Sequence, residues 1–321
     1  MQAITPPSSQ HHSVREVTIR EDGDGQRVDN YLLKVLKGVP KSRIYRILRK
    51  GEVRVNKKRV KPEFRLSIGD LLRIPPIRTS DEPEQVVLSN WVLDALQNNI
   101  LYEDKGLLIL NKPSGLAVHG GSGVSYGVIE GLRAIRPEAH FLELAHRLDR
   151  ETSGCLVIAK KRSTLRAFQA LLRDNHGIEK NYLALVKGLW EGGGRRIEAP
   201  LRKNVLSSGE RIVRVSADGK PSISLFEPQQ RFSDCTLMRV KLITGRTHQV
   251  RVHAQHTGHP IAGDDKYGDD AFNRDISQRG LKRLFLHAAE LRFTLPEHTT
   301  IHVHAPLEPA LEQLLLNLET R

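Results

Sequence analysis

The chain has 321 residues, of which 39% are hydrophobic, so it can bury a sizeable core, and its length suits about two domains. Its formal net charge is +13 and its pI is near 9.9, a balance that favours a nucleic-acid partner. Two isolated cysteines, Cys155 and Cys235, argue against a disulfide framework and a zinc knuckle and fit a reducing cytoplasm, and no apolar run approaches the ~18 residues that a membrane span needs.

A small module is expected at the start of the chain. Residues 1–15 form a polar lead without an apolar signal segment, and we expect them to be disordered. Residues 16–78 then predict two helices followed by a hairpin. The second helix is expected to be capped by Ser42 and ended by Gly51. The apolar faces consist of Val28, Tyr31, Leu32, Val35 and Leu36 in the first helix and Ile44, Ile47 and Leu48 in the second.

Much of the positive charge lies in this module. Val53 and Val55 predict a short strand, 56–58 a turn, and 66–74 a returning strand. Residues 40–65 contain five lysines and six arginines against two glutamates, a net charge of +9. We expect this basic rim to contact RNA phosphates. The candidate contacts are Arg43, Arg46, Arg49, Lys50, Lys57, Lys58 and Arg59.

A larger domain is expected after a linker. Residues 79–91 follow two prolines and read as the linker, and 92–321 form the second domain. Several of its strands come without helices between them, so we expect an α+β fold with a mixed, largely antiparallel sheet. The strands are predicted at 106–110, 155–159, 182–186, 237–243 and 286–293, with one helix at 164–172 capped by Ser163.

Two short motifs have ordinary structural explanations when taken alone. The run Asn111-Lys112-Pro113-Ser114-Gly115 follows an apolar strand and is typical of a plain turn. Alternatively, this loop places Lys112 beside a phosphate. Lys180-Asn181-Tyr182 enters a strand, and a strand tyrosine is usually a core residue with its hydroxyl at the edge.

The run His146 to Gly154, HRLDRETSG, is the most informative part of the chain. It places Asp149 between Arg147 and Arg150, and nearby positive charge favours the ionised carboxylate. Such a carboxylate can act as a nucleophile or a base, and arginines can hold a phosphate backbone against it. An aspartate before Thr-Ser-Gly can also simply cap a turn, but the nine-residue run is too particular for that explanation. It indicates chemistry on a nucleic acid.

The run Thr244 to His253, TGRTHQVRVH, is expected to be a strand. Residues two apart then share a face, so Gln249, Arg251 and His253 project together. An internal Arg251 needs an acidic partner, and Asp149 is the obvious candidate. Alternatively, the strand lies on the surface and touches RNA nonspecifically.

No motif supports a metal or an organic cofactor. His248, His253, His256 and His259 have spacings that occur in metal sites, but no cysteine or carboxylate lies within the cluster, so we expect no metal there. The chain lacks a Walker motif and Gly-x-Gly-x-x-Gly, which argues against a nucleotide cofactor. It also lacks the Gly-x-Ser-x-Gly elbow of serine hydrolases.

Together these runs resemble the RNA pseudouridine synthases that modify ribosomal and transfer RNA. The matches are NKPSG, HRLDRETSG, TGRTHQVRVH and the run from Gly258 to Asp264, and the resemblance covers nearly the whole chain. The module at 16–78 is similar to the small S4-type RNA-binding domain. Within the family, the basic module and the run LAVHGGSG are most similar to bacterial enzymes that modify several uridines of 23S ribosomal RNA.

The resemblance implies roles for the matching residues. Asp149 is the catalytic aspartate, and Arg251 pairs with it. Tyr182 lines the uracil and is the favoured candidate for removing the proton from carbon 5. Arg147 fills the gap left by the flipped-out uridine. Further RNA contacts are expected from Lys112, Arg246 and His248.

The implied reaction breaks the bond between uracil nitrogen and ribose, turns the base and rejoins it through carbon. It involves no net redox change and no hydrolysis, so no cofactor is expected. Asp149 either attacks the sugar carbon or promotes an elimination at the ribose. The implied partner is 23S ribosomal RNA or a large-subunit assembly intermediate. The protein is expected to be a cytoplasmic monomer, and no membrane partner is expected.

Two other hypotheses use the same residues differently. One is a non-enzymatic RNA-binding or ribosome-assembly protein, which depends on the basic module and needs nothing from Asp149. The other is a metal- or histidine-dependent nuclease built on His146, Asp149 and His248.

Overall fold

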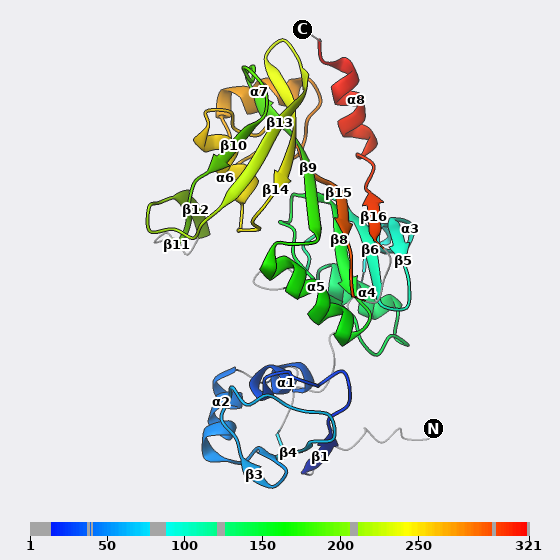
Figure 1. Ribbon diagram of the computed structural model, residues 1–321. Helices are drawn as coiled ribbons and strands as arrows, with labels where there is room; N and C mark the ends of the chain where they lie inside the picture. Colours follow the sequence, from blue (N-terminus) through cyan, green and yellow to red (C-terminus); the bar gives the residue numbers. More distant parts are fainter. Residues whose placement is uncertain are drawn as a thin grey trace, which may run out of the picture. The chain divides into compact units, whose positions relative to one another are not determined.

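The computed structural model describes residues 14–36, 39, 41–77, 88–120, 126–205, 211–296 and 300–319. The chain divides into two compact units, Met1–Gln85 and Val86–Arg321, and Figure 1 shows the elements of each. The division falls within the segment 79–91 that the sequence suggests as a linker. Residues 1–13 of the expected lead and 79–87 of the expected linker lie outside the described residues.

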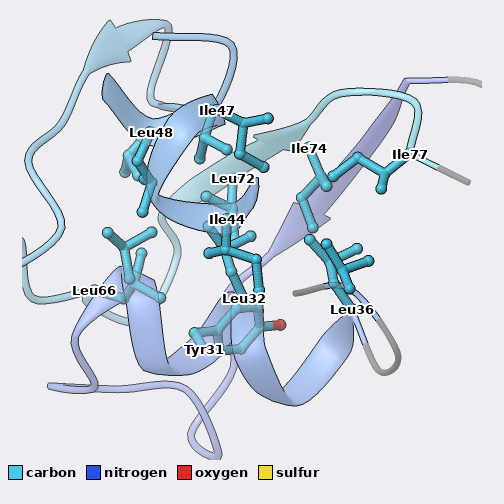
Figure 2. Close-up of a cluster of buried hydrophobic side chains, with 14 of the residues drawn as sticks. Tyr31, Leu32, Leu36, Ile44, Ile47, Leu48, Leu66, Leu72, Ile74 and Ile77 are labelled. Carbon is cyan, nitrogen blue, oxygen red and sulfur yellow. The ribbon is translucent and has the colours of Figure 1, made fainter. Parts of the chain in front are cut away.

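The first unit is a small α+β module built on a four-stranded antiparallel sheet, in the order β1-β4-β2-β3. Two helices pack on one another and on the sheet through a single apolar core that includes Leu32, Ile44 and Leu72 (Figure 2). The elements are β1 (Arg15–Thr18), α1 (Val28–Val35), α2 (Lys41–Lys50), β2 (Arg54–Val55), β3 (Lys58–Arg59) and β4 (Leu71–Ile74).

Both expected helices are present, with differences at their ends. Helix α2 begins at Lys41, so Ser42 lies within the helix and is not its cap, contrary to expectation. Gly51 follows the helix with a φ of +69°, as expected of a residue that ends a helix in the left-handed region. The returning strand is shorter than predicted, because a turn around Gly69 (φ +87°) delays pairing until Leu71.

The second unit is built on a ten-stranded sheet. Its main path runs β10-β13-β14-β9-β15-β8-β6-β5, with β16 paired to β15 and β7 to β8. All pairs are antiparallel except the short parallel pairing of β15 with β8. This confirms the expected α+β class with a mixed, largely antiparallel sheet.

The strands of this unit are β5 (Ile100–Glu103), β6 (Leu107–Lys112), β7 (Glu143–Leu144), β8 (Ser153–Ala159), β9 (Ile178–Lys187), β10 (Arg195–Glu198), β11 (Leu201–Val205), β12 (Arg211–Val215), β13 (Ile223–Arg231), β14 (Cys235–Leu242), β15 (Leu286–Phe293) and β16 (Ile301–His304). The helices are α3 (Asn90–Asn98), α4 (Val128–Ile135), α5 (Arg162–Asp174), α6 (Gln249–His256), α7 (Asp270–Gln278) and α8 (Pro309–Asn317). Strands β11 and β12 form a separate hairpin.

Helices cover both faces of the large sheet, because its central strands are apolar on both sides. Near β6 and β8, helices α3 and α4 pack on one face and α5 on the other. Near β9 and β14, α6 packs on one face, and α7 and α8 pack on the other. Figure 1 shows α4 and α5 beside the β5–β8 part of the sheet.

Two local expectations in this unit are wrong. Helix α5 begins at Arg162 after Lys161, so Ser163 lies inside the helix. The run from Gln249 is a helix and not a strand. Val250 and Ala254 are four residues apart and both enter the core beneath α6, which is helical spacing. The Gln249 side chain also bonds Thr244 and the backbone of Arg246, which fixes the turn before the helix.

Gly154 allows β8 and β15 to approach closely. Its φ is +107°, and a Cβ there would lie 2.3 Å from the carbonyl oxygen of Ala288. We therefore expect Gly154→Ala to lower the free energy of unfolding by about 2 kcal/mol or more, since strained backbone alone costs ~1–3 kcal/mol. Urea unfolding measures this. Gly193→Ala is the control, because a Cβ there meets nothing within 4 Å. Equal stability of the two variants would contradict the prediction.

Candidate active site

The residues that the sequence singles out meet in one cleft of the second unit. Asp149 lies on the loop between β7 and β8, Tyr182 on β9, and Arg251 on α6. The cleft is lined by Arg147, Leu148, Asp149, Thr152, Tyr182, Leu242, Gly245, Arg246, Thr247, His248, Gln249, Val250, Arg251 and Leu286. Six of the expected site residues therefore share this cleft, whereas Lys112 does not line it.

Arg251 is held by a carboxylate that the sequence analysis did not assign to it. Its Nε and Nη2 donate to the two oxygens of Asp264, at 2.7 and 2.6 Å. Its Nη1 lies 3.8 Å from Oδ2 of Asp149. The expected pairing of Arg251 with Asp149 is therefore present, but Asp264 is the closer partner of Arg251. The fork of the guanidinium binds Asp264, and the remaining nitrogen faces the catalytic candidate.

The Arg251–Asp264 pair is almost fully enclosed. The two side chains are 10% and 0% exposed, so both charges need close partners. Burial disfavours each charged form, but the mutual hydrogen bonds outweigh it, lowering the pKa of Asp264 and raising the pKa of Arg251. Asp264 also accepts from the backbone nitrogens of Lys266 and Tyr267, both at 2.9 Å. The pair therefore fixes Arg251 beneath the cleft.

His248 is held from behind by Tyr267. Its Nδ1 lies 2.7 Å from the Tyr267 hydroxyl, which accepts from the backbone nitrogen of Val213 at 2.9 Å. This hydrogen bond fixes the ring, so that Nε2 is the nitrogen nearer to Asp149. That nitrogen lies 3.8 Å from Asp149 Oδ2. Burial lowers the pKa of His248 despite the nearby carboxylate, which keeps the ring neutral at neutral pH.

Two neighbours, Arg251 and His248, thus each present a nitrogen toward Asp149. The arginines beside it in sequence do something else. Arg150 donates from Nε to the carbonyl of Gly115 at 2.9 Å, and Arg147 is exposed at the cleft. The charged and polar groups next to the carboxylate therefore come from α6 and the residue before it, rather than from the flanking arginines.

Tyr182 lines one side of the cleft. Burial, followed by the charge of Asp149, raises the pKa of its phenol well above the usual range. The hydroxyl is therefore protonated at neutral pH in the free protein. Two hydrophobic clusters, on either side of it along the sheet, contact its ring.

Lys112 supports the loop that carries Asp149, and the expected phosphate contact is wrong. The residue is 0% exposed. Its Nζ donates to the carbonyls of Pro113, Leu116 and Arg150 at 2.8, 2.9 and 2.9 Å. Burial lowers the pKa of the ammonium to about 7. The lysine therefore ties the loop after β6 to the residue that follows Asp149.

Three further histidines make structural contacts. His146 accepts from the backbone nitrogen of Val157 at 3.0 Å and stacks on Phe168, so it does not join Asp149 in the cleft, as a nuclease would require. His253 bonds Ser224 and the carbonyl of Ala199, and His259 bonds the carbonyl of Lys187. Within the described ranges, the four histidines from 248 to 259 form no group that could hold a metal.

All seven candidate cations of the first unit have exposed side chains on or beside α2 and the β2–β3 hairpin. Arg59 also donates to the carbonyl of Arg49 at 3.1 Å, at the end of α2. Arg246, in the second unit, is exposed and donates to the carbonyl of Pro221. Their contacts with RNA stay predictions.

Asp264 and Tyr267 are the residues that the sequence analysis missed. Asp264 is the last residue of the run from Gly258, which resembles the family but for which the sequence analysis assigned no functional role. A signal was present, because a helix from Gln249 that buries Arg251 requires a carboxylate nearby. The mistaken strand assignment concealed it. Tyr267 had no signal of its own.

Comparison with known proteins supplies the family. The RNA pseudouridylate synthase profile matches residues 106–256, and the S4 domain profile matches residues 26–72. The chain is 57% identical over 310 residues to ribosomal large subunit pseudouridine synthase C of Escherichia coli strain K12, covering 95% of this chain and 97% of that protein. The chain belongs to the RNA pseudouridylate synthase family.

Further relatives of this synthase support the same family assignment. The protein of the same name from Haemophilus influenzae is 56% identical over 308 residues, covering 95% of each chain. The solved structure of human RNA pseudouridylate synthase domain containing 4 is 26% identical, with a TM-score of 0.60 over 72% of this chain and 97% of that one. The synthase isomerises uridine in RNA to pseudouridine, which sets aside the non-enzymatic hypothesis. No helix in the described parts of the synthase is long and apolar enough to span a membrane.

His146 makes the fold of the synthase sensitive to acid. Burial lowers its pKa to about 4, against 6.5 for an ordinary histidine. The unfolded chain binds this proton first, so stability is full above about pH 6.5 and is lost as pH falls toward 4, by up to ~3 kcal/mol. We expect His146→Phe, which keeps the stacking on Phe168, to flatten this dependence. Urea unfolding at pH 7, 5 and 4 measures it, and parallel curves for the two proteins would contradict it.

Proposed function

We propose that this synthase modifies uridines of large-subunit, 23S ribosomal RNA and that Asp149 is its catalytic carboxylate. The role of Asp149 is supported above all by its position in a cleft beside Tyr182. Arg251 Nη1 and His248 Nε2 each lie 3.8 Å from its Oδ2. The substrate is proposed because the curated relatives at 56–57% identity are ribosomal large subunit enzymes and align over nearly the whole chain.

The target uridine must leave its stack to reach Asp149. Flipping costs a few kcal/mol, which contacts with the protein offset. Arg147 is exposed at the cleft and can occupy the space that the base vacates. Arg246 and His248 line the same cleft and can contact the displaced nucleotide.

Asp149 then acts at the ribose. Either its oxygen attacks the sugar carbon as the bond to uracil nitrogen breaks, or it promotes an elimination at the ribose. Both routes need a carboxylate held in a fixed position, and Arg251 and His248 lie beside its Oδ2. The freed uracil turns and its carbon 5 bonds to the sugar carbon, as the bond to Asp149 breaks in the first route or as the proton taken from the ribose returns in the second. The proton on carbon 5 is then removed, and the former glycosidic nitrogen takes up a proton.

Tyr182 is suited to the later step. The charge of Asp149 is one cause of its raised pKa. If Asp149 bonds to the sugar, that charge disappears and the phenol becomes a stronger acid. Its phenolate is then easier to form at the stage when the proton on carbon 5 must be taken. On this route, the charge of Asp149 favours a protonated Tyr182 before the bond to the sugar forms. Loss of that charge makes the proton of Tyr182 easier to remove afterwards.

We further propose that the synthase works as a cytoplasmic monomer without a cofactor, on free ribosomal RNA or on an assembly intermediate. The chemistry has no redox or hydrolytic step, so the side chains of the cleft suffice for it. The S4 domain and its basic rim give a second place to bind RNA.

Loss of the carboxylate should stop the reaction without removing the substrate. With large-subunit ribosomal RNA tritiated at uracil carbon 5, we expect wild-type synthase to release tritium and Asp149→Asn to release none. RNA affinity should stay within a few-fold, because phosphate contacts supply most of it. Pseudouridine formation by Asp149→Asn would refute the role of Asp149. Release from a transfer RNA but not from ribosomal RNA would refute the substrate.

The basic rim should act through phosphates. Neutralising Lys57, Lys58 and Arg59 to glutamine should weaken RNA binding and lower the slope of log affinity against log salt by roughly 2, at ~0.7–0.9 per phosphate contact. Filter binding between low and moderate salt measures the slope. The control neutralises three exposed cations of the other unit, Lys161, Arg173 and Arg274. An unchanged slope in the Lys57, Lys58 and Arg59 variant would contradict the assignment.

A further inference from the structure

A second group of chemically active side chains lies away from the cleft. Glu290 on β15 and His302 and His304 on β16 each direct one ligand atom to a common point, and these atoms lie within 4.8 Å of one another. His302 Nε2 is 2.7 Å from Oε1 of Glu290, and His304 Nε2 is 3.8 Å from the same oxygen. One carboxylate oxygen therefore faces two imidazoles.

Strand register creates this convergence. Glu290 lies directly opposite His304 in the antiparallel pairing of β15 and β16. His302 is two residues from His304 and so projects from the same face of the sheet. The intervening Val303 points into the apolar core on the other face. The three ligand groups thus stand on neighbouring strands, which are more rigid supports than loops.

The carboxylate is oriented before any ion arrives. Its Oε2 accepts from Asn181 Nδ2 at 2.9 Å and from Arg239 Nη2 at 2.5 Å. Glu290 is 15% exposed, whereas His302 and His304 are 44% and 67% exposed. Hydrogen bonds of this kind to a ligating carboxylate hold it in place in metal sites. They leave Oε1 to the two imidazoles.

The two histidines can supply adjacent nitrogen ligands. Their rings are 4.7 Å apart between centroids, and the Nε2 of each lies near the same oxygen of Glu290. Two imidazoles and a carboxylate are the ligand set that zinc uses with an open fourth position.

We propose that Glu290, His302 and His304 form a surface site for a zinc-type dication, with water as the remaining ligand. Tetrahedral ligands at zinc bond lengths of 2.0–2.2 Å are about 3.4 Å apart, so small side-chain rotations suffice to close the site. Nickel and copper ions suit the same donors, whereas magnesium and calcium prefer oxygen ligands. The site is distinct from the histidines at 248–259.

The cation would stabilise the fold and take no part in the reaction. Glu290 accepts from Asn181, which neighbours Tyr182 on β9. Glu290 borders a smaller pocket together with Tyr182, but none of the three proposed ligands lines the reaction cleft. An ion there would cross-link β15 to β16, the strand that pairs only with β15 in the described sheet.

Zinc titration of the chelator-treated full chain tests the site. We expect calorimetry to show one site per chain that loses at least tenfold in affinity in His302→Ala/His304→Ala. His11→Ala/His12→Ala is the matched control, because these adjacent histidines of the N-terminal segment are another place where zinc can bind; it should retain the site. Magnesium should not compete, and acidification to pH 5 should weaken zinc binding at least tenfold, since protons compete for the imidazoles.

A second readout separates binding from any effect on folding. Zinc should raise the melting temperature of the wild type and not that of His302→Ala/His304→Ala, while tritium release stays unchanged in both. Equal zinc affinity in the wild type and this variant, or no saturable zinc uptake by the wild type, would overturn the proposal. Loss of the site in the His11→Ala/His12→Ala control would assign the metal to the N-terminal segment instead.

Discussion

The buried ion pair between Arg251 and Asp264 is the interaction on which the reaction cleft depends. Two charges can be kept inside a protein only if each is closely paired, and removing one partner of such a pair costs about 3–5 kcal/mol. Asp264 takes two nitrogens of the guanidinium and two backbone N–H groups. This leaves one nitrogen of Arg251 facing Asp149. The nitrogen of Arg251 beside the proposed catalytic carboxylate is therefore positioned by Asp264, which is not among the residues that line the cleft.

The catalytic loop is fixed from its other side by groups that touch no substrate. Lys112 binds the carbonyl of Arg150, and Ser114 donates to the carbonyl of Glu151. Gly154 then lets β8 enter the sheet against β15. Several strands thus hold a short loop in one conformation. The supports of the loop thus belong to the sheet, which suits chemistry that depends on the positioning of groups.

The sequence was informative where local pattern decides structure. Alternation predicted β15 at its observed bounds, and the short motifs predicted which side chains meet in the cleft. It failed where partners are distant in the chain. Lys112 looked like a phosphate ligand, because only the fold shows three carbonyls around its ammonium. The run from Gln249 fits both strand and helix, and its burial beside β14 decides for the helix. The same limit concealed Glu290, which register alone brings to His302 and His304.

The single-turnover rate of pseudouridine formation by Asp264→Asn tests the central claim most directly. Asparagine keeps the shape of the side chain but removes the charge that holds Arg251. Asp265→Asn, an exposed neighbour, is the control, and circular dichroism at the assay temperature verifies that both proteins are folded. The account predicts at least a tenfold loss of rate in Asp264→Asn with RNA affinity unchanged within a few-fold. A wild-type rate in folded Asp264→Asn would contradict it.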